Sequence, residues 1–185
     1  MKYFKKLEGD RIYLSPRNSD DVEKFTEWLN DFQVTDYTQR SANVMTLQAE
    51  SEYLNNSKEE YAMVIVTKDE DKMIGTVSIE QINFINRTGT LGIFIGDKDY
   101  RDKGYGTEAI KLILEYAFQY INLNNVMLTV MSYNDRAKRC YEKCGFKEFG
   151  RRHQSVYMDG KYYDTIYMEV LKENFECNNI RNKNI

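Results

Sequence analysis

The feature that most constrains this chain is a glycine-containing loop that separates a strand-like segment from an amphipathic helix. Thr88–Ile95 has the apolar residues of a strand, and the residues from about Gly104 to Tyr120 repeat apolar side chains at helical spacing. The sequence between them reads Arg101-Asp102-Lys103-Gly104-Tyr105-Gly106-Thr107. Because glycine has no Cβ, the two glycines let backbone N–H groups turn toward one anion, and the positive end of the following helix points to the same place. The sequence therefore predicts a loop that binds a phosphate or a pyrophosphate.

The composition suits one globular domain with a hydrophobic core. The chain has 185 residues, of which 42% are hydrophobic, and its net charge of −3 leaves no basic footprint for nucleic acid. The segment Met1–Lys6 lacks the apolar run of a signal peptide, and no stretch reaches the length of a membrane span. We therefore expect a cytoplasmic protein without nucleic-acid or membrane partners, with one domain over residues 1–175 and a polar tail over residues 176–185.

The cysteines argue against a disulfide framework and against a metal centre. There are three, Cys140, Cys144 and Cys177, and their odd number and wide spacing do not form a pairing pattern. Cys140 and Cys144 lie four residues apart on a predicted helix, but the chain has a single histidine, His153, and no Cys-x-x-Cys. We expect reduced, structural thiols and no bound metal.

Two helices and a strand are expected in the N-terminal part. Ile12–Ser15 has the pattern of a short strand, and Ser19 is placed as the N-cap of an amphipathic helix over residues 20–30. A second helix covers about Leu47–Asn56, and residues 31–46 form the loop between the two helices.

The central part of the chain predicts a mixed sheet. Three strand-like segments, Tyr61–Thr67, Met73–Asn83 and Thr88–Ile95, are separated by turn residues and form an antiparallel meander. The helix after the glycine loop leads to a further strand over Val126–Met131. A strand, a helix and a strand in this order predict a right-handed crossover and a parallel pair.

The C-terminal part predicts a short helix and a hairpin. Asn134–Cys144 has a helical pattern that ends at Gly145. Gln154–Met158 and Lys161–Val170 flank the turn Asp159-Gly160, which is a strong signal for a type I′ hairpin.

Asn134 and Tyr141 form a second candidate site. They lie seven residues apart, so on a helix they share one face, with the small residue Ala137 between them. An amide at one end, a small floor and a phenol at the other end suit a thin, extended ligand. Each residue also has a plainer interpretation, since Asn134 is a good helix N-cap and Tyr141 is one of 15 tyrosines.

Together these segments resemble the GNAT superfamily of acetyl-CoA-dependent N-acetyltransferases. The Arg101-x-x-Gly104-x-Gly106 loop is similar to its pyrophosphate motif, and Asn134…Tyr141…Gly145-Phe146 is similar to its pantetheine-binding and general-acid helix. The resemblance extends from Ile12 to about Leu171 and is closest to the branch of ribosomal-protein N-terminal and polyamine acetyltransferases. It implies a single α+β domain with a mixed, mostly antiparallel twisted sheet that is splayed at its centre and has helices on both faces.

The resemblance also implies roles for individual residues. Backbone N–H groups from Arg101 to Thr107 would hold the CoA pyrophosphate, and the backbone of Phe94, Ile95 and Gly96 would pair with the pantetheine arm. Asn134 would hydrogen-bond the arm, and Tyr141 would act as general acid at the sulfur. Acetyl-CoA would be the cosubstrate, and no metal would be needed.

The base that receives the amine proton is open between two candidates. The amine must be neutral to attack, and alkyl amines titrate near 10.4. Glu80 is the candidate carboxylate, but strand alternation also allows Glu80 to face solvent with Gln81 inward, and a water chain would then serve as base. In either case we expect direct transfer in a ternary complex, without a covalent enzyme intermediate.

Three departures or ambiguities accompany the resemblance. Asp102 stands where many relatives carry glycine, which puts a negative side chain beside the pyrophosphate, and Asp97-Lys98 replaces a proline. The residue that contacts the CoA 3′-phosphate is open among Lys103, Lys138 and Arg139.

Two other functions fit parts of the sequence. One is a non-catalytic CoA-binding or sensing module, and the other is a binder of a different nucleotide, although Thr107-Glu108 replaces the Lys-Ser/Thr of a P-loop.

For the enzyme, the acceptor is expected to be a primary amine on a polypeptide N-terminus, a polyamine, an amino sugar or a drug. Its pocket would be built by residues 31–46, the second helix and the Asp159-Gly160 hairpin, where Tyr157, Tyr162 and Tyr163 either line the pocket or only pack on the sheet. A homodimer through the hairpin or the meander edge is a further possibility.

Overall fold

A computed structural model describes residues 2–56 and 61–176 of the chain. Cys177 and the tail from residue 177 onward therefore lie outside the described residues. Within these described ranges, eight strands hydrogen-bond in the order β1-β2-β3-β4-β5-β6-β8-β7. Only β5 and β6 have a parallel register among the pairs recorded for the described residues, and the other recorded pairs are antiparallel. This mixed, mostly antiparallel sheet with helices confirms the expected α+β class.

The chain forms two compact units, and three of its elements contribute residues to both. The first unit comprises Met1–Ser78 and Ile93–Ala109, and the second comprises Ile79–Gly92 and Ile110–Ile185. β4, β5 and the helix after the glycine loop each contribute residues to both units.

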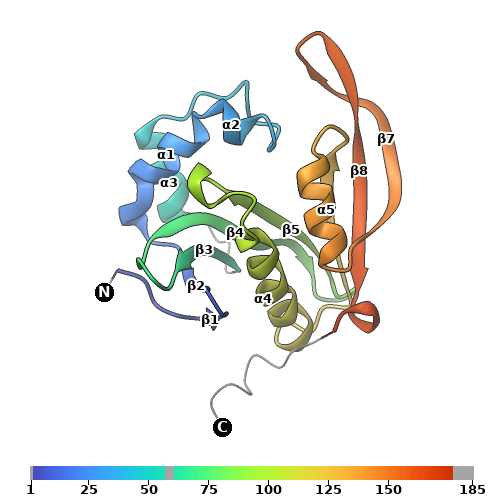
Figure 1. The fold of residues 1–185 in the computed structure, drawn as a ribbon, viewed down its shortest axis with the longest axis horizontal. Coiled ribbons are helices and arrows are strands. Elements are labelled where there is room, and N and C mark those ends of the chain that lie inside the picture. Colours follow the sequence, from blue (N-terminus) through green and yellow to red (C-terminus); the bar gives the residue numbers. More distant parts are fainter. Residues whose placement is uncertain (1, 57–60, 177–185) are drawn as a thin grey trace. The chain divides into compact units, whose positions relative to one another are not determined.

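The strands of the first unit are β1 (Leu7–Glu8), β2 (Ile12–Pro16), β3 (Ala62–Thr67) and the first half of β4 (Met73–Asn83). Its helices are α1 (Val22–Leu29), α2 (Phe32–Thr35) and α3 (Leu47–Asn56), and α1 packs beside α3 (Figure 1). The unit also contains the short 3₁₀ turns Ser19–Asp21 and Lys98–Tyr100.

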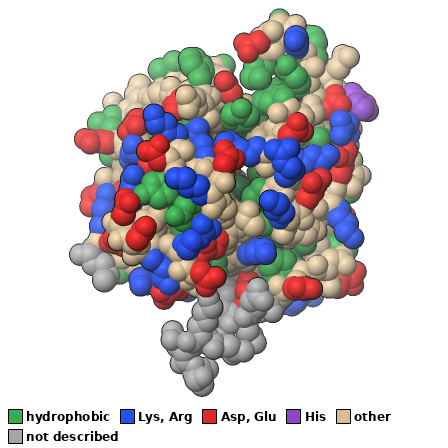
Figure 2. Space-filling model, in the orientation of Figure 1, with side chains coloured by type: hydrophobic (Ala, Val, Ile, Leu, Met, Phe, Trp, Pro, Cys, Tyr) green, Lys and Arg blue, Asp and Glu red, His purple; other side chains and the backbone are tan. Residues whose placement is uncertain are grey.

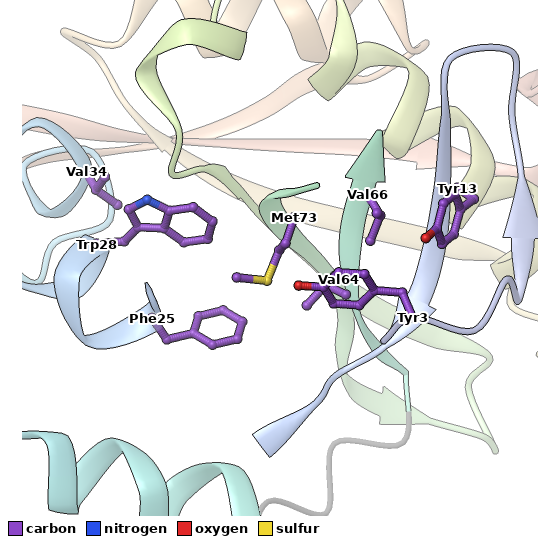
Figure 3. Packing of buried hydrophobic residues seen from close by; sticks show 8 residues of the cluster. All are labelled: Tyr3, Tyr13, Phe25, Trp28, Val34, Val64, Val66 and Met73. Carbon is purple, nitrogen blue, oxygen red and sulfur yellow. The ribbon is translucent and has the colours of Figure 1, made fainter. Parts of the chain in front are cut away.

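Aromatic and branched side chains from the sheet and from α1 fill the core of the first unit. Figure 3 shows Trp28 and Phe25 of α1 facing Met73 of β4, with Val64 and Val66 of β3 beyond them. The rings of Phe25 and Trp28 meet edge to face, with centroids 6.0 Å apart. Apolar burial of this kind contributes roughly 25 cal/mol per Å², so the cluster fixes α1 against the sheet.

Two expectations for this unit were wrong in detail. Asn18, and not Ser19, caps the first turn, because its side chain accepts the Asp20 N–H at 2.9 Å, and α1 itself begins only at Val22. The segment of residues 31–46 is not all loop, since it contains α2. The Asp31 side chain caps α2 by accepting the Gln33 N–H at 2.8 Å. A four-residue helix is too short to produce a visible hydrophobic period.

The second unit carries the parallel pair and the long hairpin. Its elements are α4 (Tyr105–Gln119, in part), β5 (Thr88–Ile95, in part), β6 (Asn125–Met131), α5 (Asp135–Lys143), β7 (Lys147–Met158) and β8 (Lys161–Leu171). β5 and β6 pair from Thr88 with Asn125 to Thr90 with Met127, which confirms the predicted crossover. The hairpin of β7 and β8 extends past α5 (Figure 1).

The hairpin confirms the predicted turn but not its length. Asp159 and Gly160 have φ of 50° and 79°, as a type I′ turn requires. β7 begins at Lys147, seven residues before the expected Gln154. The register shifts between Arg152 and Val156 hide the strand from a search for simple alternation.

The face of the molecule drawn in Figure 2 carries both kinds of charge, with basic and acidic side chains interspersed over it. None of the described helices is long and apolar enough to cross a bilayer.

Candidate functional site

The glycine loop has the backbone conformation of an anion cradle. Asp102 and Gly104 both adopt positive φ, at 60° and 85°. α4 begins at Tyr105, and its first recorded backbone bond runs from the Glu108 N–H to the Gly104 carbonyl. The N–H groups of Tyr105 and Gly106 belong to the first turn, where the helix itself supplies no acceptor. They are therefore placed to donate to an anion at the positive end of α4.

The conformation at Asp102 explains why glycine suits this position. A φ of 60° lies in the left-handed region, which costs most L-residues roughly 1–2 kcal/mol and which Asp and Asn tolerate better. The departure from the family pattern is therefore conformationally acceptable. The negative charge of Asp102 would still weaken the binding of an anion at this loop.

Arg11, at the start of β2, holds the loop from the side. Its Nη1 donates to the Lys103 carbonyl at 2.9 Å, and its Nε donates to Glu108 Oε2 at 3.1 Å. The guanidinium also lies over the Tyr105 ring, 4.4 Å from the centroid. Glu108 in turn accepts the Arg11 backbone N–H at 2.9 Å. This pairing offsets the negative charge of Glu108 near the anion cradle.

Sequence reasoning missed Arg11. It precedes Glu108 by 97 positions, and no motif marks it. The only available signal was the carboxylate in the first turn of α4, which needs a cation if an anion is to bind nearby.

The end of β5 has fewer free backbone groups than the resemblance implied. The Gly96 N–H donates to the Ile74 carbonyl at 3.0 Å, so it is engaged within the protein. The Ile95 carbonyl accepts Arg101 Nε at 3.1 Å. The Asp97 N–H donates to the same carbonyl as the Gly96 N–H, at 3.2 Å, so the regular alternation of the strand does not continue past β5. Of the three expected residues, Gly96 therefore has its N–H bonded within the protein, and ligand contacts of Phe94 and Ile95 stay predictions.

Two glycines let this strand end approach its neighbours closely. A Cβ at Gly75 would lie 2.3 Å from the Phe94 carbonyl oxygen, and a Cβ at Gly96 would lie 2.1 Å from the Trp28 ring. Gly96 is thus a packing residue.

Asn134 is both a helix cap and a candidate ligand contact. Its side-chain oxygen accepts the Ala137 N–H at 3.1 Å, which confirms the plainer interpretation. Its exposed fraction is only 7%, and its amide N–H groups are of the type that can donate to a pantetheine carbonyl.

Tyr141 is a protonated phenol at physiological pH. The Tyr141 ring meets the Phe146 ring edge to face, with centroids 6.0 Å apart. The residue is half-buried. Desolvation by burial raises the pKa of Tyr141 well above its usual value, with a smaller contribution from the neighbouring Cys140 and Cys144. The residue can donate a hydrogen bond to a departing thiolate.

Glu80 is half-buried, and Gln81 is exposed. Gln81 has a positive φ of 50°, which breaks the alternation of β4, and its side chain accepts the Thr90 hydroxyl at 3.2 Å. The alternative with Gln81 inward was therefore wrong, while Glu80 remains a candidate base. Asn134, Tyr141 and Glu80 belong to the second unit, whereas the glycine loop and Phe94–Gly96 belong to the first.

Neither of the two described cysteines, Cys140 and Cys144, forms a disulfide. Hydrogen bonding to Cys140 and burial raise the pKa of Cys144, so it stays a neutral thiol and a poor nucleophile. Within the described residues, no group of three or more His, Cys, Asp or Glu side chains is arranged to hold a metal ion.

The tyrosines of the hairpin pack against one another. The rings of Tyr157 and Tyr162 are 5.0 Å apart and both remain exposed, whereas Tyr163 meets Tyr133 at 4.8 Å. Of the candidates for the 3′-phosphate, Lys138 pairs with Glu148 at 3.2 Å.

Comparison with known proteins gives a consistent result. Residues 11–147 match the model of the acetyltransferase (GNAT) domain. The "Probable N-acetyltransferase YjcK" of Bacillus subtilis (strain 168) is 30% identical over 181 residues, which cover 92% of this chain and 99% of that protein. The spermidine N(1)-acetyltransferase of Vibrio cholerae is 31% identical over 111 residues, which cover 60% of this chain and 64% of that protein.

The fold also matches solved structures. The crystal structure of spermidine N-acetyltransferase from Vibrio cholerae in complex with CoA and spermine has a TM-score of 0.79 at 24% identity, covering 90% of this chain and 98% of that chain.

Proposed function

Because the chain belongs to the GNAT acetyltransferase family, we propose that it moves the acetyl group of acetyl-CoA directly to a primary amine within a ternary complex. The observation that carries the proposal is the cradle at the start of α4, with two left-handed residues, first-turn N–H groups and a carboxylate already paired to Arg11. This combination suits a pyrophosphate. The thioester end of the donor would then be bound by residues outside the loop.

In the proposed reaction, the N–H groups of Tyr105 and Gly106 hold the pyrophosphate. The Ile95 N–H faces the thioester carbonyl and stabilises the oxyanion that forms on attack, as donors of this kind do in acyl transfer. Asn134 hydrogen-bonds the pantetheine arm.

Proton transfer completes the reaction. The neutral amine attacks the carbonyl carbon, the C–S bond breaks, and the leaving sulfur receives the proton of Tyr141. Glu80 or a water takes the proton of the amine and releases it to solvent, and Tyr141 regains a proton from solvent before the next turnover. The burial of the Cys144 thiol supports direct transfer, because this residue is a poor acyl carrier.

The acceptor is proposed as a primary amine of a small molecule or a peptide N-terminus. One relative is named as a spermidine N(1)-acetyltransferase, and another, from Bacillus subtilis, is named as a putative ribosomal N-acetyltransferase. The first name supports a small amine as acceptor, and the second supports a polypeptide amine. The reduced state of the two described cysteines fits a cytoplasmic enzyme. A homodimer stays a prediction that sedimentation can check.

The test is release of free CoA thiol from acetyl-CoA with a panel of amines. The panel contains spermidine, an amino sugar and peptides with free and blocked N-termini. We expect thiol release with at least one free amine, and none with its blocked counterpart. The alternative, a CoA-binding or sensing module, predicts CoA binding by calorimetry and no release with any amine.

A further inference from the structure

The guanidinium of Arg101 binds three backbone carbonyls and joins two elements of the first unit. Nε donates to the Ile95 carbonyl at 3.1 Å, and Nη2 donates to the Gly96 carbonyl at 2.8 Å. Nη1 donates to the Gln33 carbonyl at 3.4 Å. The first carbonyl belongs to the last residue of β5, the second belongs to the residue after it, and the third belongs to α2.

This arrangement uses the side chain differently from what its place in a phosphate loop suggests. A guanidinium has five N–H donors in a rigid plane, so it can span several carbonyls at once, whereas an ammonium group is a point charge. Each of the three nitrogens of Arg101 already has a carbonyl partner. The loop can bind its anion through backbone N–H groups and leave this side chain to hold β5 and α2 together.

α2 is short and partly buried. It spans four residues, from Phe32 to Thr35, and is capped by Asp31. Val34 and Thr35 are buried, and Val34 belongs to the core cluster of the first unit, whereas Phe32 is 66% exposed. A single turn of helix is not stable alone, so its position depends on tertiary contacts.

We propose that Arg101 is a positioning residue that fixes α2, on the acceptor side, to the strand end that receives the donor. The proposal rests on the proposed acetyl transfer, in which residues 31–46 help to form the acceptor pocket. The backbone of Arg101 lies in the loop proposed to bind the donor, and its side chain bonds to the Gln33 carbonyl of α2, so a donor held by the loop would restrain α2 through these contacts. Occupancy of the donor loop therefore prepares the acceptor side.

Amide hydrogen exchange with CoA alone tests the coupling without turnover. The amides of Val34, Thr35 and Asp36 donate within α2, so their exchange reports its opening. In the wild type we expect CoA to slow their exchange about five- to tenfold, which is the lower range of site-to-site coupling. Arg101→Met should abolish this protection. The matched control Lys98→Met, which removes a positive charge from the same segment, should retain it.

Steady-state kinetics give a second readout. Arg101→Met should raise the acceptor KM about tenfold or more while the Kd for CoA changes less than about threefold, and Arg101→Lys should lie in between. Equal CoA protection of α2 in the wild type and Arg101→Met, or none in the wild type, would overturn the proposal. An equal rise of CoA Kd and acceptor KM would also do so, because Arg101 would then contact the donor. A wild type that shows the exchange coupling but transfers no acetyl group would instead contradict the proposed function.

Discussion

At the scale of single residues, the loop that we propose for the donor depends more on backbone conformation than on side-chain chemistry. Asp102 and Gly104 turn the chain through left-handed conformations, and Tyr105 and Gly106 then present their N–H groups. The spacing of the glycines predicted this loop from the sequence. The side chain of Arg101 could not be assigned that way, since its carbonyl partners come from distant segments.

Asp102→Gly is expected to tighten donor binding. The substitution removes a negative charge near the pyrophosphate and relieves a left-handed non-glycine residue. We expect the Kd for CoA to fall about two- to fivefold, as measured by calorimetry, with little change in stability because glycine also adds unfolded-state entropy. Asp102→Asn separates the two effects, since it removes the charge and keeps a side chain that tolerates this conformation. An unchanged Kd in both variants would mean that the Asp102 charge does not reach the anion.

Tyr141→Phe is expected to slow transfer about a hundredfold or more without weakening CoA binding, because general acids typically contribute at least that factor. Burial raises the pKa of Tyr141, so its phenol keeps its proton as the pH rises through the usual tyrosine pKa of about 10. The ratio of wild-type to variant kcat should therefore stay constant from about pH 7 to 10. A ratio that falls toward one within this window would show that Tyr141 ionises there, against the assignment.

At the scale of elements, the bounds of regular helices and strands could be predicted from the periodicity of their apolar residues. The elements that could not be predicted have local causes. α3, β4 and β5 have the expected bounds. β1 and α2 are too short to show a period, and β7 carries a bulge. Contacts between elements, such as Arg11 with α4, were beyond the sequence because they join residues 97 positions apart.

Gly96→Ala is expected to destabilise the protein, because the added Cβ would overlap the Trp28 ring. Overpacking of this kind typically costs about 1–3 kcal/mol, which lowers Tm by about 3–10 °C for a chain of this size. Gly150→Ala is the matched control, since a Cβ there meets no atom within 4 Å. Differential scanning calorimetry of both variants makes the comparison. Equal Tm values for the two would argue against tight packing of β5 on α1.

A double-mutant cycle of Arg11→Met and Glu108→Gln should show a coupling of about 1 kcal/mol in unfolding free energy, as expected for a half-exposed charged pair with several hydrogen bonds. The CoA Kd should rise several-fold in Arg11→Met, because Glu108 is then left uncompensated near the anion. Denaturant unfolding and calorimetry measure the two quantities. Additive unfolding energies would mean that Arg11 and Glu108 do not act as a pair.

At the scale of the whole molecule, the fold class and the family followed from a few ordered motifs, since strand, glycine loop, helix and strand in this order leave few alternatives. The acceptor did not follow, because its pocket would be built from loops and from a hairpin whose tyrosines also pack on each other. A short motif in the sequence is enough to predict the donor. Specificity for the acceptor depends instead on side chains of loops and of the hairpin, whose positions no motif predicts.

CoA at about a hundredfold excess over its Kd is expected to stabilise the folded protein by about 2.7 kcal/mol, which raises Tm by about 5–10 °C. ATP at the same concentration should give a clearly smaller shift. A thermal shift assay decides between them, and a larger shift with ATP would favour a different nucleotide ligand.

The most direct test of the account is a single-turnover experiment with isotope-labelled acetyl-CoA and an amine found active in the panel. Intact-mass spectrometry of the acceptor and of the protein follows the label over time. The account predicts that the label moves to the acceptor in one step and never appears on the protein. Labelled protein that forms and decays before the product, for example acetylated at Cys140, would contradict direct transfer.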